Sequence, residues 1–172
     1  MSSLSKFQET LKRNGIARSN RFKVRLTLPN AMAVGYNVDE IALFCEESTI
    51  PGRGYSTVPR GAGVNGLQEF VPYDKLYDDI NMTFRCSEDM VERKFFEDWF
   101  ETISGTNNRF AYLDDYATNI EVVQLNSQDQ EIMSFTLEEA YPTVVAEISL
   151  SQAPNEYNRF QVTFKYKKYR IS

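Results

Sequence analysis

A strand followed at once by an amphipathic helix, within residues 79–105, places the strongest constraint on how this chain can fold. Apolar and polar residues alternate from Ile80 to Cys86, which is the period of a strand with one buried face. The period then becomes that of a helix, with apolar residues on one side and charged residues on the other. The sequence therefore predicts a helix over 88–104 that packs on a sheet. Its core-facing side comprises Val91, Phe95, Trp99 and Ile103.

Both ends of this predicted helix carry residues that helix ends favour. Ser87 can accept a hydrogen bond from a free N–H group of the first turn, so we expect it to be the N-cap. Glu88 and Asp89 place negative charge at the positive end of the helix dipole. Gly105 can adopt the left-handed conformation that commonly ends a helix.

Most of the remaining chain predicts β structure. Alternating apolar and polar residues predict strands over 21–28, 119–125, 131–138 and 157–170, and a further strand is expected over 40–48. Aromatic residues make up 13% of the chain and charged residues 25%, which favours an aromatic-rich β core. The predicted fold is mainly β, an antiparallel β-sandwich or barrel-like domain with one flanking helix.

Two segments do not fit into such a core. We expect a single domain over 1–172, with 1–20 as an N-terminal arm and 49–78 as an extended loop or protruding hairpin. About thirty residues without a clear element is long for a compact domain, which favours a hairpin over a surface loop. The arm contains a possible short helix over 3–13, which would be marginal alone. It is either a frayed terminus or a segment that becomes ordered against a neighbouring subunit.

The composition argues against several kinds of site and location. The chain has no histidine, which removes the Ser-His-Asp arrangement and every histidine-based metal site. Its formal net charge of -5 argues against a protein that grips nucleic acid over its whole surface. Apolar runs fall short of the roughly 20 residues of a membrane helix, and the first residues lack a signal-peptide core. We expect a cytosolic protein with Cys45 and Cys86 as buried, reduced thiols.

Three motifs allow both a chemical and a structural interpretation. The glycines of 61–66 match a dinucleotide-binding loop, but neither the preceding strand nor the following helix is indicated, so we expect a loop tip and no cofactor. The aspartates at 78–79 and 114–115 are either the two carboxylates of a hydrolase or solvated surface residues. The basic and aromatic run over 165–170 either binds phosphates and stacks bases or forms the polar face of an exposed strand beside a negatively charged neighbour.

Several short motifs occur together along the chain. They are the run 16–22, the segment 45–52 with Ile50-Pro51-Gly52, the helix segment 95–99, Ala140-Tyr141-Pro142-Thr143, and the closing strand 160–169. In this order they resemble the tail tube proteins of contractile-tailed bacteriophages, over nearly the whole chain. Type VI secretion tube proteins and baseplate tube proteins are similar in fold. The resemblance implies a structural protein, without catalysis, cofactor or metal, whose six-subunit rings stack into the inner tail tube.

The resemblance also implies partners. Strands of neighbouring subunits would join into a barrel that lines the lumen, and double-stranded DNA would pass through it to the host without specific binding. The tail sheath, the baseplate tube proteins and the tape measure protein would be further partners. The expected location is the virion tail, after assembly in the host cytoplasm. The hairpin and the arm would contact the next ring, and the residues expected at subunit contacts are Leu4, Phe7, Leu11, Arg53, Tyr55, Arg60, Tyr73 and Tyr77.

Three alternatives stay open. A baseplate tube protein of the same fold would start the tube instead of extending it, although 172 residues leave no room for an added domain. A carboxylate-dependent hydrolase would use the acidic pairs at 78–79 and 114–115. A DNA-binding module would show strong, salt-dependent affinity.

Overall fold

The computed structural model describes residues 3–32, 35–61, 68–105, 109–152 and 156–172. Strands dominate these residues, so the predicted mainly β fold is confirmed. The helices are α1 (Ser3–Asn14), α2 (Val38–Leu43), α3 (Val91–Ser104) and α4 (Leu113–Tyr116). The strands are β1 (Phe22–Leu26), β2 (Cys45–Ser48), β3 (Arg53–Arg60), β4 (Glu69–Tyr77), β5 (Ile80–Arg85), β6 (Thr118–Leu125), β7 (Glu131–Val145), β8 (Arg159–Lys165) and β9 (Lys168–Ile171).

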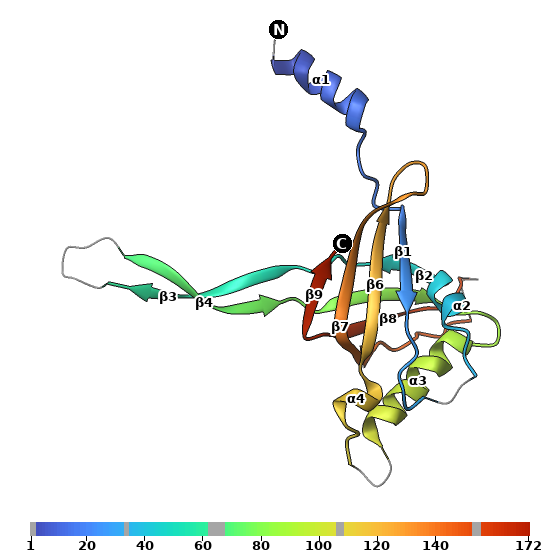
Figure 1. Ribbon diagram of the computed structural model, residues 1–172. Coiled ribbons are helices and arrows are strands. Elements are labelled where there is room, and N and C mark those ends of the chain that lie inside the picture. The colour runs from blue at the N-terminus through green and yellow to red at the C-terminus, as the bar shows by residue number, and fades with distance from the viewer. Residues whose placement is uncertain (1–2, 33–34, 62–67, 106–108, 153–155) are drawn as a thin grey trace.

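One bent antiparallel sheet forms the body, and β7 connects its two layers. The strand order is β1-β6-β7-β8-β5-β2, and β9 also pairs with β7. The first part of β7 pairs with β6 and β9, and its last residues pair with β8. Between these parts lies Glu139, whose φ of 53° is left-handed. Such a residue bends a strand at a bulge, and β7 crosses from one layer to the other at this point (Figure 1).

The core lies where α3 packs on the sheet. Phe95, Phe96 and Trp99 are completely buried, and the Trp99 ring lies 6.1 Å from that of Phe164 in β8. The indole Nε1 of Trp99 donates to the carbonyl oxygen of Tyr116 at 2.9 Å, so the polar atom of this ring is satisfied inside the core. The helix thus joins the sheet to α4.

Two residues of the predicted core-facing side lie at the ends of α3 and are less buried. Ile103 is half-buried and packs against the core. Val91 is 39% exposed, so its prediction as a core residue is wrong. The helix begins at Val91 and not at residue 88, so this side chain lies at the edge of the contact with the sheet.

The predicted N-cap of α3 is also wrong. Met90 precedes the helix with a left-handed φ of 53°, and its side chain makes no capping hydrogen bond. Ser87 instead donates from its backbone N and from Oγ to one carboxylate oxygen of Glu92, at 2.9 Å in both cases. These two bonds allow the Glu92 carboxylate to be buried, and they fix the turn that leads into the helix.

Two predicted strands differ in the structure. Residues 40–48 are not one strand, because helix α2 occupies Val38–Leu43 before the short strand β2 begins. Ile41 and Ala42 are both buried on this helix, which explains the apolar residues on which the predicted strand over 40–48 rested. The predicted closing strand is two strands, since the chain leaves β8 after Lys165 and returns as β9 beside β7.

Cys45 and Cys86 are free, so the prediction of reduced thiols is confirmed, but both are half-buried and the prediction that they are buried is wrong. Burial raises the pKa of the Cys45 thiol to about 12, which keeps it protonated and unreactive at neutral pH. Among the described residues, the helices are too short or too polar to cross a membrane.

Candidate assembly surfaces

Strands β3 and β4 form a two-stranded hairpin that projects from the body (Figure 1). Val58 pairs with Val71, and the next pair along, Pro59 and Phe70, faces the opposite side. Both faces therefore carry exposed apolar residues, and an isolated two-stranded hairpin is at best marginally stable in water. Contact with other molecules on either face would bury these apolar side chains and so stabilise the hairpin. The exposed large apolar side chains of the hairpin are Tyr55, Val58, Phe70, Val71, Tyr73 and Leu76.

The root of the hairpin is held by tyrosines of the body. The Tyr77 ring lies 5.9 Å from the Tyr166 ring and 5.7 Å from the Tyr169 ring. The Tyr166 hydroxyl donates to the backbone oxygen of Asp78 at 2.8 Å, and burial raises its pKa to about 12. Of the hairpin residues predicted at subunit contacts, Tyr77 therefore packs within its own subunit. Arg53, Tyr55, Arg60 and Tyr73 are exposed.

The N-terminal arm carries the predicted amphipathic helix as α1. This helix stands away from the sheet at the end of the arm (Figure 1). Leu4 is 66% and Phe7 61% exposed, while Leu11 is half-buried. The predicted apolar side of α1 is thus largely open to solvent, where a neighbouring molecule could cover it.

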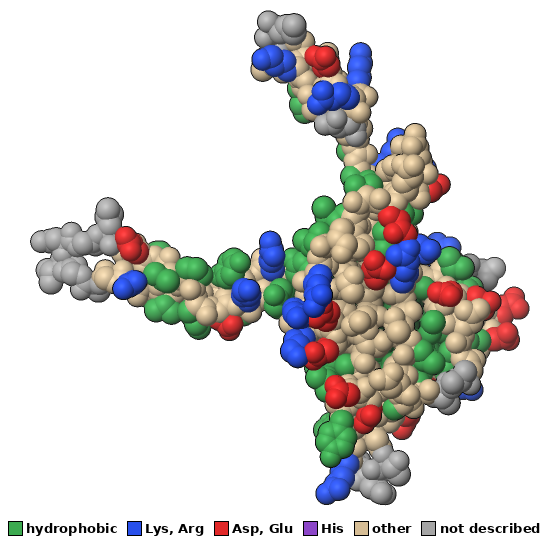
Figure 2. All heavy atoms as spheres, viewed as in Figure 1, with side chains coloured by type: hydrophobic (Ala, Val, Ile, Leu, Met, Phe, Trp, Pro, Cys, Tyr) green, Lys and Arg blue, Asp and Glu red, His purple; other side chains and the backbone are tan. Residues whose placement is uncertain are grey.

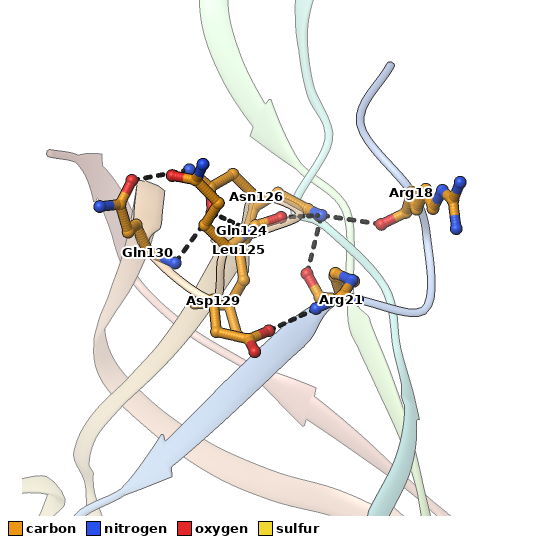
Figure 3. Close-up of polar contacts among 8 residues, drawn as sticks. Arg18, Arg21, Gln124, Leu125, Asn126, Asp129 and Gln130 are labelled. Carbon is orange, nitrogen blue, oxygen red and sulfur yellow. Dashed lines mark hydrogen bonds and ion pairs between the residues drawn. The ribbon is translucent and has the colours of Figure 1, made fainter. Parts of the chain in front are cut away.

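A single side-chain amide holds the root of the arm against the sheet (Figure 3). Nε2 of Gln124 donates to the carbonyl oxygens of Arg18 at 2.9 Å and Arg21 at 2.8 Å. The backbone N of Leu125 donates to the same Arg21 oxygen at 2.9 Å. An ion pair of 2.5 Å joins Arg21 to Asp129 in the turn between β6 and β7. The arm therefore leaves the body at a defined point.

The open face of β1, β6, β7 and β9 is polar and carries paired charges (Figure 2). The register brings Arg25, Glu121, Thr136 and Arg170 into one row across these four strands. Arg25 contacts Glu121 at 2.7 Å and also pairs with Glu131. The hydrogen bond from Arg25 lowers the pKa of Glu121. Positive and negative groups thus neutralise each other locally on this face.

Each basic residue of the run over 165–170 pairs with a carboxylate of the same chain. Lys167 contacts Glu139 at 2.6 Å, and this hydrogen bond raises the pKa of Lys167. Glu138 forms ion pairs with both Lys168, at 3.1 Å, and Arg170. Lys165 lies 3.9 Å from Asp79. The expected negatively charged neighbour of this run is therefore present within the subunit.

The acidic and glycine motifs lie in contexts that favour structural roles. Asp114 and Asp115 are in the first turn of α4, and their backbone oxygens accept from Asn30 and Ala31. Asp79 pairs with Lys165. Most of the glycine motif, residues 62–67, lies outside the described residues; the antiparallel strands β3 and β4 flank it in place of a strand and a helix. Within the described parts of the chain, His, Cys, Asp and Glu form no group of three or more that could hold a metal ion.

The main path of the body sheet ends in the edge strands β1 and β2, and β9 forms a further edge because, among the described strands, it pairs with β7 alone. In the described residues, β1 and β2 each pair on one side only. The other side of an edge strand presents backbone N–H and C=O groups that a strand of another molecule can pair with. The β1 and β2 edges are therefore candidate surfaces for lateral assembly.

Three residues of the candidate surfaces were not identified from the sequence. Phe110 and Tyr112 precede α4 and are 83% and 85% exposed. Two aromatic residues in an otherwise polar connection were the signal that could have identified them. Gln124 gave no such signal, because a polar residue is expected at alternate positions of a half-buried strand.

Open sheet edges, a projecting hairpin and a projecting helix together define a subunit built for assembly. Three comparisons agree with this class. The family model for the phage tail tube protein matches residues 17–172. A tail tube protein of Serratia phage KSP90 is 23% identical over 172 residues, which cover 96% of this chain and 95% of the relative. The chain therefore belongs to the phage tail tube protein family and is a structural component of the virion tail.

Solved structures share its fold. A chain in the 6-fold symmetrised cryo-EM structure of the anti-feeding prophage baseplate superposes with a TM-score of 0.71 and 14% identity, over 92% of this chain and 97% of the other. A chain in the sheath-tube complex of the extracellular contractile injection system PVC, in the extended state, gives a TM-score of 0.66 and 15% identity, over 100% and 99%. The predicted resemblance to tail tube proteins is confirmed.

Proposed function

We propose that six copies of this subunit close into a ring and that such rings stack into the inner tube of a contractile phage tail. The observation that carries this proposal is the pair of unpaired sheet edges, β1 and β2. A closed ring can pair the β1 edge of each copy with the β2 edge of its neighbour, which removes both of these exposed edges. The 6-fold symmetry of the anti-feeding prophage baseplate supports the number of copies.

The hairpin and the arm contact the adjacent ring in this proposal. Both project from the body and expose apolar side chains, as a heterologous contact between stacked rings requires. Within the single domain of 1–172, the arm is 1–20 and the hairpin segment is 49–78. The contact residues proposed for the arm and hairpin are Leu4, Phe7, Leu11, Arg53, Tyr55, Arg60 and Tyr73. Tyr77 contributes by holding the hairpin root.

Duplex DNA passes along the polar face of β1, β6, β7 and β9 in the proposed tube. Arg25, Lys168 and Arg170 of this face contact carboxylates, so these cations are less available to hold phosphate groups, and DNA is not retained. The role is structural, with no catalytic step and no bound cofactor. Assembly takes place in the host cytoplasm, and the tape measure protein occupies the lumen before DNA.

Sheath and baseplate proteins are the proposed outer and terminal partners. Support comes from the shared fold of chains in the PVC sheath-tube complex and in the anti-feeding prophage baseplate. The exposed side of α3 carries Glu97 and Glu101 and is the proposed surface toward the sheath, because the opposite side of this helix packs on the sheet.

Negative-stain microscopy of the purified protein, alone and with baseplate tube proteins, tests the proposal. The expected result is long hollow tubes of uniform diameter. A strict monomer at high concentration, with and without the baseplate proteins, would contradict it.

A tube initiator of the baseplate is the second candidate function. The superposition on a baseplate chain, with a TM-score of 0.71, favours it. An initiator would form single rings or short stacks that do not lengthen as protein is added, whereas a tube subunit would extend them.

A further inference from the structure

Two aromatic side chains that precede helix α4, before β6, lack an evident role in the subunit. Phe110 is 83% and Tyr112 85% exposed, next to the helix α4 that precedes the strand. Large apolar side chains that lie together on a surface mark sites of contact with other molecules. We refer to Phe110 and Tyr112 as the aromatic knob.

A pocket lies at the other end of the same strand. Its volume is about 470 Å3, and it lies between the root of the arm and the turn after β6. Ile16, Leu125 and Ile132 give it an apolar lining, and Arg18 adds a cationic group. The Gln124 hydrogen bonds hold one wall in place (Figure 3). We refer to this site as the arm-root pocket.

The aromatic knob cannot reach the arm-root pocket of its own subunit. They lie at opposite ends of β6, whose 8 residues extend over about 26 Å. In Figure 1, α4 lies at the lower end of the sheet and the arm root at the upper end. A second copy displaced along the direction of β6 would bring its knob to the pocket of the first, and this head-to-tail contact repeats indefinitely.

The charges near the two sites are complementary. Asp114 and Asp115 follow the knob directly, in the first turn of α4. Arg18 lines the pocket, and its side chain points away from the hydrogen-bonded cluster in Figure 3. A guanidinium group can pair with a carboxylate and can also stack on an aromatic ring. The guanidinium group of Arg18 can therefore contact both the carboxylates of Asp114 and Asp115 and the rings of the aromatic knob on a second copy.

We propose that the aromatic knob of each subunit inserts into the arm-root pocket of a second copy in the adjacent ring. This inference rests on the proposed tube function and names a contact between rings that is separate from those of the hairpin and of α1. An aromatic side chain buries roughly 150–250 Å2 when it is covered, so two rings per subunit form a compact anchor. Arg18 of the receiving copy contacts Asp114 or the Tyr112 ring of the inserted one.

Photochemical cross-linking tests the contact directly. Tyr112 is replaced by benzoylphenylalanine, which keeps an aromatic ring in the knob, and tubes are assembled from a mixture of unlabelled and 15N-labelled subunits. The expected cross-links join position 112 to residues 15–18, 125–127 or 132 of a different copy. Benzoylphenylalanine in place of Tyr157, another exposed tyrosine, is the matched control and should give no cross-links to these segments. Cross-links from position 112 to other segments only would overturn the proposal.

Assembly of alanine variants gives a second readout. Phe110→Ala combined with Tyr112→Ala should raise the protein concentration needed for tube formation by at least about tenfold, which corresponds to about 1.4 kcal/mol per contact. Leu150→Ala removes another highly exposed apolar side chain and should change this concentration less than about twofold. If both variants raised this concentration equally, the proposed contact of the aromatic knob would be contradicted.

Failure of the inference and failure of the proposed function give different results. Tubes that form normally from the knob variant, with cross-links elsewhere, would overturn the knob contact and leave the tube function standing. If the wild-type protein forms no tubes with or without baseplate proteins, the tube function fails. Cross-linking at high protein concentration then still decides whether position 112 reaches the pocket of a second copy.

Discussion

The hairpin and the N-terminal arm both project from the body, but their roots are held differently. Three tyrosine rings and the hydrogen bond from Tyr166 to Asp78 fix the hairpin, so its direction depends on packed side chains. The arm contains Gly15, with φ +68°, after helix α1, and its root is held chiefly through backbone carbonyls that accept from Gln124. Packed rings hold the hairpin root from several directions, whereas the arm root depends on very few hydrogen-bond donors. The hairpin is thus the rigid projection and the arm the adjustable one.

The largest change in stability is expected for a substitution in the core of the body, which carries both the hairpin and the arm. Trp99→Ala should lower the free energy of unfolding by about 3–5 kcal/mol, because it leaves a cavity and an unpaired Tyr116 carbonyl in the core. Urea unfolding followed by circular dichroism measures this change. Glu101→Ala on the exposed side of the same helix is the control and should cost less than about 0.5 kcal/mol. A similar small loss for Trp99→Ala would show that α3 does not support the sheet.

A smaller effect is expected at the hairpin root. Tyr77→Ala removes two ring contacts and should cost about 1–2 kcal/mol, while hydrogen exchange in β3 and β4 becomes faster. Tyr73→Ala changes an exposed tyrosine of the same hairpin and should leave both stability and exchange nearly unchanged. Equal exchange in the two variants would mean that the tyrosine cluster does not hold the root.

The arm root should respond more locally. Gln124→Ala removes the donor for the Arg18 and Arg21 carbonyls and should cost about 1 kcal/mol. Trypsin should cleave after Arg18 several times faster, because the segment no longer lies against the sheet. Gln128→Ala, in the neighbouring turn, is the control. An unchanged cleavage rate would show that the Gln124 side chain does not hold the root and that the Arg21 contacts with Asp129 and Leu125 suffice.

The smallest expected effect is on the pH dependence of stability. Arg25 lowers the pKa of Glu121 in the folded protein, so this pair stabilises the fold above the unfolded pKa of about 4.3. That contribution, at most about 1 kcal/mol for a partly exposed pair, is lost as the pH falls through the lower, folded pKa. Glu121→Gln should remove this part of the acid dependence of thermal unfolding between about pH 5 and 2. An identical profile for wild type and variant would contradict the role of the pair.

The sequence predicted the elements whose periodicity is strong and local. The alternation around Phe84 and the four-residue spacing of Phe95 and Trp99 gave β5 and α3 because one side of each element is buried. It failed at residues 40–48, where the buried pair Ile41 and Ala42 is compatible with a short helix as well as a strand. Such short apolar runs are decided by tertiary packing.

The candidate surfaces were predicted unevenly for a related reason. Exposed apolar residues in the arm and hairpin could be recognised, since a compact core has no place for those segments. The packing of Tyr77 on Tyr166 and Tyr169 could not, because it joins residues about ninety positions apart. The pairing of Glu138 with Lys168 and Arg170 likewise follows from the return of β9 beside β7, a topology that periodicity does not specify.

In the proposed tube, the exposed apolar residues of the hairpin serve assembly and contribute little to the stability of the subunit. The most direct measurement compares the double variant Tyr55→Ala and Phe70→Ala with wild type, both in urea unfolding and in negative-stain microscopy of tubes. Both side chains are exposed in the subunit, so we predict a change in unfolding free energy within about 0.5 kcal/mol and the loss of long tubes. Tubes of normal length and number would contradict the claim.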